Sequence, residues 1–184
     1  MIIGITGLAS SGKDTAAEYF QKRGWQIFSC SDILRDEAKI IMMPDTRENL
    51  ISLATKIKKE QGGDILIKKI LTKVKGNAVI LGIRHPDEVK LLQKRNDFYL
   101  LFIDVDPRVR FNRAQSRAKK NDEITSFDKF LKLENIERKG LSGGQAVDEV
   151  INIANYTVDN SKDKSSLWQQ IDLIMQKIKS QTNE

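Results

Sequence analysis

The sequence IIGITGLASSGKDT occupies residues 2–15 and decides the fold of this chain. Within it, residues 7–13 match the first seven positions of the pattern G-x-x-x-x-G-K-[ST], after an apolar strand and before an amphipathic helix. The glycines let the backbone wrap so that successive N–H groups face phosphate oxygens. The positive end of the following helix points at the same anion, and Lys13 adds a full charge. The sequence therefore predicts a phosphate-binding loop.

One position of this loop departs from the general pattern. Asp14 follows Lys13, and the hydroxyl comes one residue later, at Thr15. This order resembles nucleoside monophosphate kinases, where magnesium, an ion that keeps its waters, is held largely through phosphates and water. Thr15 would then be a weak magnesium ligand, and Asp14 either accepts hydrogen bonds from metal-bound waters or is an acid suited to a first helical turn. The residues expected to contact ATP and Mg²⁺ here are Gly7, Ala9, Ser10, Ser11, Gly12, Lys13, Asp14 and Thr15.

Strands and helices are expected to alternate along the rest of the chain. Strands are predicted at 2–6, 25–28, 78–81, 98–105 and 156–158. Helices are predicted at 13–23, 33–42, 65–74, 87–93, 108–119, 126–138, 145–154 and 165–179, with another that begins at Thr46. Ser31 or Asp32 is expected to cap the helix at 33–42. Short apolar strands alternating with helices predict an α/β fold with three layers around a parallel sheet.

The composition is that of one globular domain. The chain has 184 residues, 40% hydrophobic and 30% charged, enough for a single core. No apolar run is long enough to cross a bilayer and no signal peptide is visible, while Cys30 is the only cysteine. We therefore expect a cytoplasmic monomer or small homo-oligomer without a membrane partner. The net charge of +6 favours anionic ligands, although it does not choose between phosphates and nucleic acid.

Segments beyond the loop resemble the acceptor side of P-loop kinases. Ser31-Asp32-Ile33-Leu34-Arg35 looks like the acceptor-site entry of adenylate-kinase-like and deoxynucleoside monophosphate kinases, residues 47–62 like their acceptor-binding helices, and residues 82–89 like their third-strand exit. The likeness is strong to an uncharacterised, mainly archaeal, dephospho-CoA-kinase-like branch. It implies a P-loop NTPase fold with a helical acceptor-binding insertion at about 31–75. The residues that it assigns to a phosphorylated acceptor are Ser31, Asp32, Arg35 and Arg84.

A group of arginines follows the strand predicted at 98–105. Arg110, Arg113 and Arg117 are spaced so that they share one helical face. The segment resembles the lid helix of nucleoside monophosphate kinases, whose arginines close over the transferring phosphate. The resemblance implies a small lid at about 110–140 within the single domain 1–184.

Together these features predict a small-molecule kinase that transfers the γ-phosphate of ATP to a nucleoside or deoxynucleoside monophosphate. Lys13, Arg113 and Arg117 would be the catalytic residues, because their charges stabilise the transferring phosphate. The resemblance also implies that the turn ending at Asn160 contacts the donor adenine. Dephospho-CoA is the alternative acceptor, and neither ATP over GTP nor the acceptor itself is fixed by these motifs.

Two features of the sequence must be weighed against the kinase prediction: the residue at position 81 and the segment at 141–145. Kinases of this group carry an aspartate near the place that Leu81 occupies. Its loss leaves three alternatives: Asp104 or Asp106 substitutes, the metal relies on water, or the activity is weak. A non-catalytic nucleotide-binding or RNA-binding regulator therefore remains a rival, although nucleic acid is not the expected partner. Residues 141–145 spell LSGGQ, the signature of ABC-type ATPases, but no strand ending in Asp-Glu follows, so a helix-capping loop is expected there.

Overall fold

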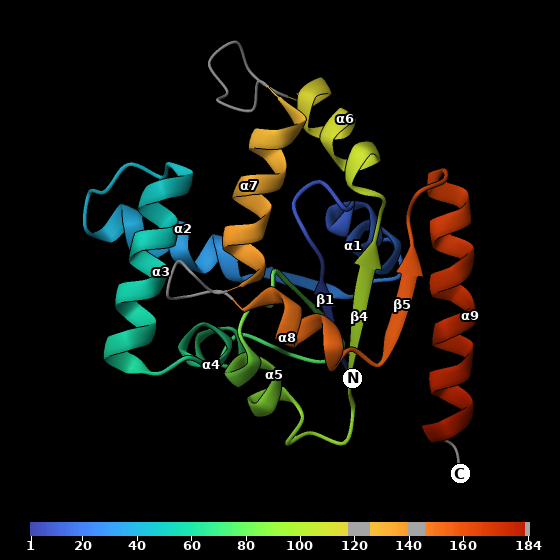
Figure 1. Cartoon of the computed structure of the whole chain (residues 1–184). Helices are drawn as coiled ribbons and strands as arrows, with labels where there is room; N and C mark the ends of the chain where they lie inside the picture. The colour runs from blue at the N-terminus through green and yellow to red at the C-terminus, as the bar shows by residue number, and fades with distance from the viewer. Residues whose placement is uncertain (118–125, 140–145, 183–184) are drawn as a thin grey trace.

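The computed structural model describes residues 1–117, 126–139 and 146–182. Within these residues a five-stranded sheet has the order β2-β3-β1-β4-β5, and each pair of neighbours is parallel (Figure 1). The strands are β1 (Ile2–Thr6), β2 (Gln26–Ser29), β3 (Ala78–Leu81), β4 (Phe98–Asp104) and β5 (Tyr156–Asp159). Because β1 is central, the loop that follows it lies at the middle of the sheet's carboxyl edge, where open α/β sheets bind ligands.

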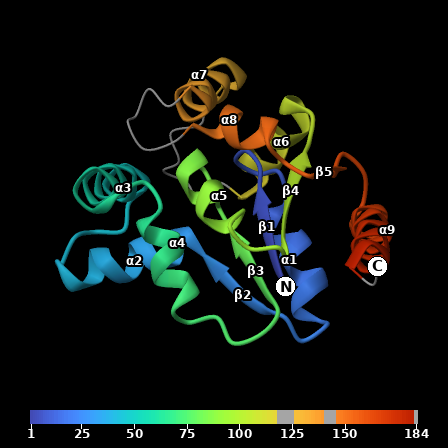
Figure 2. The ribbon, with the colours of Figure 1, turned by 90° about the horizontal axis from the view of Figure 1, so that it is seen from below.

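Helices cover both faces of the sheet, as Figure 2 shows from below. One face carries α1 (Lys13–Gln21) and α9 (Lys164–Thr182), and the other carries α2 (Cys30–Ile40), α3 (Arg47–Gln61), α4 (Ile65–Leu71), α5 (Pro86–Leu92) and α8 (Val147–Asn152). Successive side chains of β1 point to opposite faces of the sheet. Ile3 packs with Phe20 and Ile171 on the face covered by α1 and α9, while Ile2 packs with Ile67 and Val150 on the other face. The predicted three-layer α/β P-loop fold is thereby confirmed.

The contact between α9 and α1 includes a polar anchor. The indole Nε1–H of Trp168 donates to the backbone oxygen of Thr15 at 3.0 Å. The last helix thus holds the first turn of the helix that follows the phosphate-binding loop. A second aromatic contact lies at the other end of α1, where the rings of Phe20 and Trp25 are 5.2 Å apart.

Most helix boundaries lie within a few residues of the prediction, and α2 shows why one does not. The helix begins at Cys30 because the side chain of Ser29 accepts from the Ser31 N–H at 3.2 Å. The predicted cap at Ser31 or Asp32 is therefore wrong by two or three residues. The predicted cap at Thr46 is confirmed, since its Oγ1 accepts from Asn49 N at 3.3 Å.

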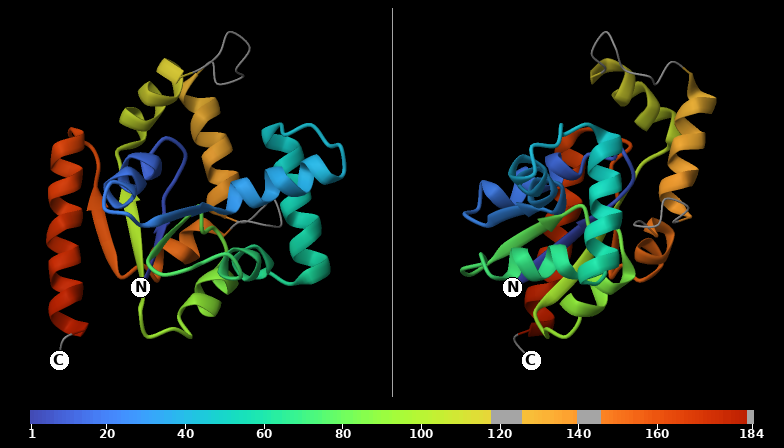
Figure 3. Two further views of the ribbon diagram at one scale, coloured as in Figure 1. Left: turned by 180° about the vertical axis from the view of Figure 1, so that it is seen from behind. Right: turned by 90° about the vertical axis from the view of Figure 1, so that its left-hand side faces the viewer.

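Two helices stand above the carboxyl ends of the strands in Figure 3. They are α6 (Pro107–Arg117) and α7 (Phe127–Arg138), and they occupy the region predicted to be the lid. The LSGGQ segment at 141–145 lies outside the described residues. No helix in the described ranges combines the length and apolar character needed to span a membrane.

Candidate active site

The phosphate loop, residues 7–13, has a shape that depends on glycine. Gly12 has a φ of 91°, in the left-handed region. A Cβ at Gly12 would lie 2.1 Å from Nδ2 of Asn160, and one at Gly7 would lie 2.7 Å from Oγ of Ser11. Ser11 is 1% exposed, and its Oγ has no hydrogen-bond partner among the described residues. The loop therefore requires glycine at positions 7 and 12, and a buried hydroxyl without a partner among the described residues fits the phosphates of a nucleotide.

Lys13 lies in the first turn of α1, against the loop. Its Nζ donates to the backbone oxygens of Gly7 and Leu8, each at 2.8 Å. Burial and the positive charges of Arg84 and Arg110 lower the pKa of Lys13 to about 7, although the carboxylate of Asp14 acts in the opposite direction. Two guanidinium groups from separate parts of the chain therefore lie near the ammonium group. A bound phosphate would favour the charged form of Lys13 and raise its pKa again.

Asn160 follows β5 and connects the loop with the lid region. Its side chain is buried, and Nδ2 donates to the backbone oxygen of Ser11 at 2.7 Å. Its own backbone oxygen accepts from Nη2 of Arg113 at 2.8 Å, and its N–H donates to Asp104 O at 2.8 Å. The amide thus supports the loop from behind. A contact between this turn and the donor adenine stays a prediction.

The arginines of α6 face two different directions. Arg113 is half-buried, and its Nη1 has no hydrogen-bond partner among the described residues. Arg110, expected on the same face, is 2% exposed, donates from Nε to Val105 O at 2.9 Å and forms a two-pronged ion pair with Glu134 of α7. Arg110 therefore joins α6 to α7. Arg117 ends α6, and its side chain lies outside what the structure describes.

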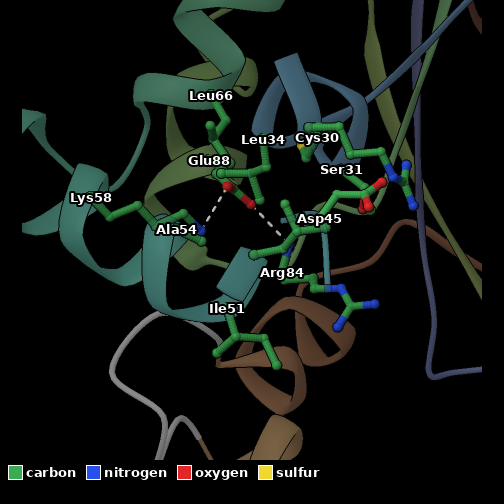
Figure 4. A pocket seen from close by; sticks show the side chains of 13 residues that line it. Cys30, Ser31, Leu34, Asp45, Ile51, Ala54, Lys58, Leu66, Arg84 and Glu88 are labelled. Carbon is green, nitrogen blue, oxygen red and sulfur yellow. Dashed lines mark hydrogen bonds and ion pairs between the residues drawn. The ribbon is translucent and has the colours of Figure 1, made fainter. Parts of the chain in front are cut away.

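A cavity of about 250 Å³ opens among α2, α3, α4 and the turn after β3 (Figure 4). Part of its wall is apolar, from residues such as Leu34, Ile51 and Leu66. Ser31, Arg35 and Arg84 line it together, although they come from separate elements. Three of the four residues predicted to bind the acceptor therefore share one cavity.

The fourth predicted acceptor residue, Asp32, is exposed and lies outside this lining. Its carboxylate accepts from Nη1 of Arg35 at 2.7 Å. Both side chains are well exposed, so this pair contributes little to stability. Its effect is to neutralise part of the charge at Arg35.

The lining also holds two charged residues that sequence reasoning missed. Lys58 and Glu88 are 7% and 1% exposed, and Lys58 Nζ lies 2.9 Å from Glu88 Oε1. Glu88 Oε2 accepts from the N–H groups of Arg84 at 2.8 Å and His85 at 3.0 Å. His85 is the N-cap of α5 and Glu88 its third residue, a capping box. That spacing is visible in the sequence, whereas the approach of Lys58 from α3 is not.

The donor set for magnesium is sparse. Leu81 is 8% exposed and packs in the apolar cluster beneath α1, while Asp106 Oδ1 accepts from the Arg108 N–H at 2.8 Å to start α6. Asp104 is exposed. Across the described residues, no three His, Cys, Asp or Glu side chains gather as a metal site. The residues present fit an ion held mainly by phosphates and water, and a role for the Thr15 hydroxyl as a magnesium ligand stays a prediction.

Solved structures share this fold at low sequence identity. TT1252 from Thermus thermophilus superimposes with a TM-score of 0.58 at 16% identity, over 96% of this chain and 97% of its own. Shikimate kinase from Acinetobacter baumannii, in complex with shikimate, gives a TM-score of 0.58 at 14% identity over 96% and 93%. At such identity the likeness confirms the P-loop kinase fold, while the substrates of those enzymes do not transfer.

Proteins found by sequence comparison are more similar to this chain than these solved structures are. A family model described as an AAA domain matches residues 3–141. A UPF0200 protein of Pyrococcus horikoshii is 32% identical over 189 residues, which cover 98% of each chain. A UPF0200 protein of Methanocaldococcus jannaschii is 29% identical over 97% of this chain and 90% of its own. The chain therefore belongs to the UPF0200 family and, over residues 3–141, to the family that the AAA-domain model describes.

Proposed function

We propose that this protein is a small-molecule kinase that moves the γ-phosphate of ATP to a phosphorylated acceptor, a nucleoside or deoxynucleoside monophosphate. One observation carries the proposal: Arg84 lines the acceptor cavity and lies near enough to Lys13 that its charge lowers the lysine's pKa. The phosphate loop, which would bind ATP, and the arginine predicted to hold the acceptor's phosphate therefore lie close together. Within the single domain, residues 31–75 would form the acceptor region and residues 110–140 the lid.

Each charged residue has a role in this scheme. The N–H groups of the loop and Lys13 bind the β- and γ-phosphates. Arg84 holds the acceptor's phosphate in line, aided by Arg35 and Ser31. Arg113, anchored on the Asn160 oxygen, and Arg117 stabilise charge on the transferring group. An arginine of this kind contributes roughly 10³–10⁵ in rate in related phosphoryl transfers.

Magnesium, when bound with ATP, would neutralise charge on the β- and γ-phosphates. The chain's own part is to present the Thr15 hydroxyl and, near it, the carboxylate of Asp14. No general base is needed, because the acceptor's phosphate oxygen is already anionic at neutral pH. His85 is accordingly not assigned to catalysis, and its ring accepts from Asp87 N at 3.2 Å to cap α5.

The proposal is tested by phosphate transfer and calorimetry with a panel of AMP, CMP, dCMP, GMP, UMP, dTMP and dephospho-CoA. A true acceptor raises the melting temperature by mass action and accelerates release of ADP. The change Lys13→Ala should abolish transfer while circular dichroism stays unchanged, because the lysine serves the ligand. Lys75→Ala, at an exposed position remote from the loop, is the matched control.

Three outcomes are distinguished by this panel. Transfer to a monophosphate supports the proposal, and transfer to dephospho-CoA alone would replace it with the alternative acceptor. Tight ATP binding with no transfer to any acceptor would favour a non-catalytic nucleotide-binding regulator. Transfer that survives in Lys13→Ala would contradict the assignment of the phosphate loop.

A further inference from the structure

Asn160 is the first residue after β5, and its buried side chain lies against the phosphate loop. The residue is 5% exposed, and its Nδ2 donates to the backbone oxygen of Ser11 at 2.7 Å. The approach to the loop is close, since a Cβ at Gly12 would lie 2.1 Å from the same Nδ2. The amide of Asn160 therefore occupies the space that any side chain at position 12 would need.

The turn that carries Asn160 is held by bonds that do not use its side chain. The backbone N–H of Asn160 donates to Asp104 O at 2.8 Å, and its backbone oxygen accepts from Nη2 of Arg113 at 2.8 Å. One residue earlier, the side chain of Gln170 on α9 bonds to both the N–H and the oxygen of Asp159, at 3.1 and 2.8 Å. Truncating the side chain of Asn160 therefore removes its bond to the loop and leaves these bonds of the turn in place.

The phosphate loop benefits from such support because its backbone is costly to order. Gly12 has a φ of 91°, and glycine loses more conformational freedom on folding than any other residue. Within the loop, the Ser11 N–H donates to Leu8 O at 3.3 Å, which is longer than a typical hydrogen bond of this kind. If the loop had the binding shape in only a fraction of the molecules, its affinity for phosphate would be reduced by that fraction.

We propose that Asn160 is a positioning residue for the phosphates of the nucleotide: its amide holds Ser11 and Gly12 in the shape that presents the N–H groups of the loop to an anion. This role differs from the adenine contact predicted for the same turn, because it acts through the loop and does not depend on the base. Asn160 should therefore matter equally for every ligand that places two phosphates in the loop. The inference rests on the proposed function only in taking the loop as the phosphate site.

Calorimetric titration with pyrophosphate, ADP and GDP tests this role, since pyrophosphate carries no base. In Asn160→Ala the Kd for all three ligands should rise by the same factor, roughly three- to tenfold, as the loss of one neutral hydrogen bond implies. Asn155→Ala is the matched control at the other end of β5, where Oδ1 of Asn155 accepts from the Leu100 N–H at 2.7 Å. This control loses a bond of the same kind to the backbone, remote from the loop, and should keep the wild-type Kd for pyrophosphate.

A second variant, Asn160→Ser, guards against misfolding. Its shorter side chain no longer reaches the Ser11 oxygen, so it should show the same loss if Asn160→Ala does not fold. A wild-type Kd for pyrophosphate in the folded variant, or a loss confined to ADP, would overturn the positioning role. An equal loss in Asn155→Ala would also overturn it, because the effect would then follow from lower stability alone. If the wild type itself did not bind pyrophosphate, the phosphate site and the proposed function would both be wrong.

Discussion

At the scale of single residues, the main feature of the candidate site is that several positively charged side chains lie close together. Lys13 has a pKa of about 7 because it is buried and because Arg84 and Arg110 lie near it. Such crowding is unfavourable until an anion arrives, and it makes the loop selective for ligands with several negative charges. The same crowding makes nucleotide binding depend on pH in a range where most lysines do not titrate.

Nucleotide affinity should fall as pH rises above 7. The free protein loses the Lys13 proton near pH 7, whereas the complex keeps it, so binding above this pH requires uptake of one proton. The Kd for ADP should increase roughly eightfold between pH 7.5 and 8.5, a range in which a phosphate monoester, with its second pKa of about 6, is already ionised. Calorimetry in buffers of different ionisation enthalpy measures the proton directly. A constant Kd without proton uptake would show that Lys13 stays charged in the free protein.

At the scale of elements, the helices of the region predicted to be the lid are joined by one buried and one exposed ion pair. Arg110 of α6 and Glu134 of α7 pair within the protein, Arg138 of α7 lies 2.8 Å from Asp148 of α8, and the N–H of Ala146 bonds to Arg84 O at 2.9 Å. The helices above the strand ends are therefore linked to the turn that carries the acceptor arginine. The spacing in the sequence predicted that the arginines of α6 share one face, but it gave no sign that Arg110 would pair with Glu134 of α7.

Removing Glu134 should destabilise the whole domain. The change Glu134→Ala leaves Arg110 buried without a counter-charge, which typically costs about 3–5 kcal/mol, and urea denaturation measures this loss. Replacing both residues, as Arg110→Met with Glu134→Leu, should cost much less because no unpaired charge remains. Glu149→Ala, at an exposed position on α8, should change stability by less than about 0.5 kcal/mol. If Glu134→Ala lowered the free energy of unfolding by no more than this control, the Arg110–Glu134 pair would not be needed for stability.

At the scale of the whole molecule, the proposed donor and acceptor sites are built from different segments. The phosphate loop follows β1, whereas the cavity takes its walls from α2, α3, α4 and the turn after β3. Arg84 lines the cavity and lies near Lys13 of the loop. This division allows the two ligands to be affected separately by mutation.

Arg84→Ala should weaken the acceptor and spare the donor. Loss of a charge-assisted hydrogen bond to phosphate costs roughly 1.5–3 kcal/mol, while the loop amides and Lys13 hold ATP without it. Calorimetric titration at pH 6, where Lys13 is protonated with or without Arg84, measures the binding of ATP and of the best acceptor of the panel. Equal losses for the two ligands would assign Arg84 to the donor site or to the structure, and unchanged binding of both would make it a surface residue.

The local motifs were the predictable part of this site. The strand, loop and helix at residues 2–21 are contiguous, so β1, the glycines and Lys13 follow from the sequence alone. The cavity is not contiguous: Lys58 meets Glu88 only after α3 has packed against the turn that follows β3, and no spacing in the chain signals that approach. The first residue of α2 was missed for a smaller reason, because Ser29, Ser31 and Asp32 are all competent caps and only the path out of β2 selects Ser29.

The hydrogen bond from the Trp168 indole to Thr15 O gives the protein an optical signal of its own. Thr15 is in the first turn of the helix that follows the phosphate loop, so a shift of this turn on nucleotide binding should alter the electric field along the indole and, with it, the wavelength of emission. Trp25, the second tryptophan, lies at the far end of the same helix against Phe20. With Trp25→Phe, a single emitter remains, and the arrival of a nucleotide can be timed in a stopped-flow instrument without any attached dye.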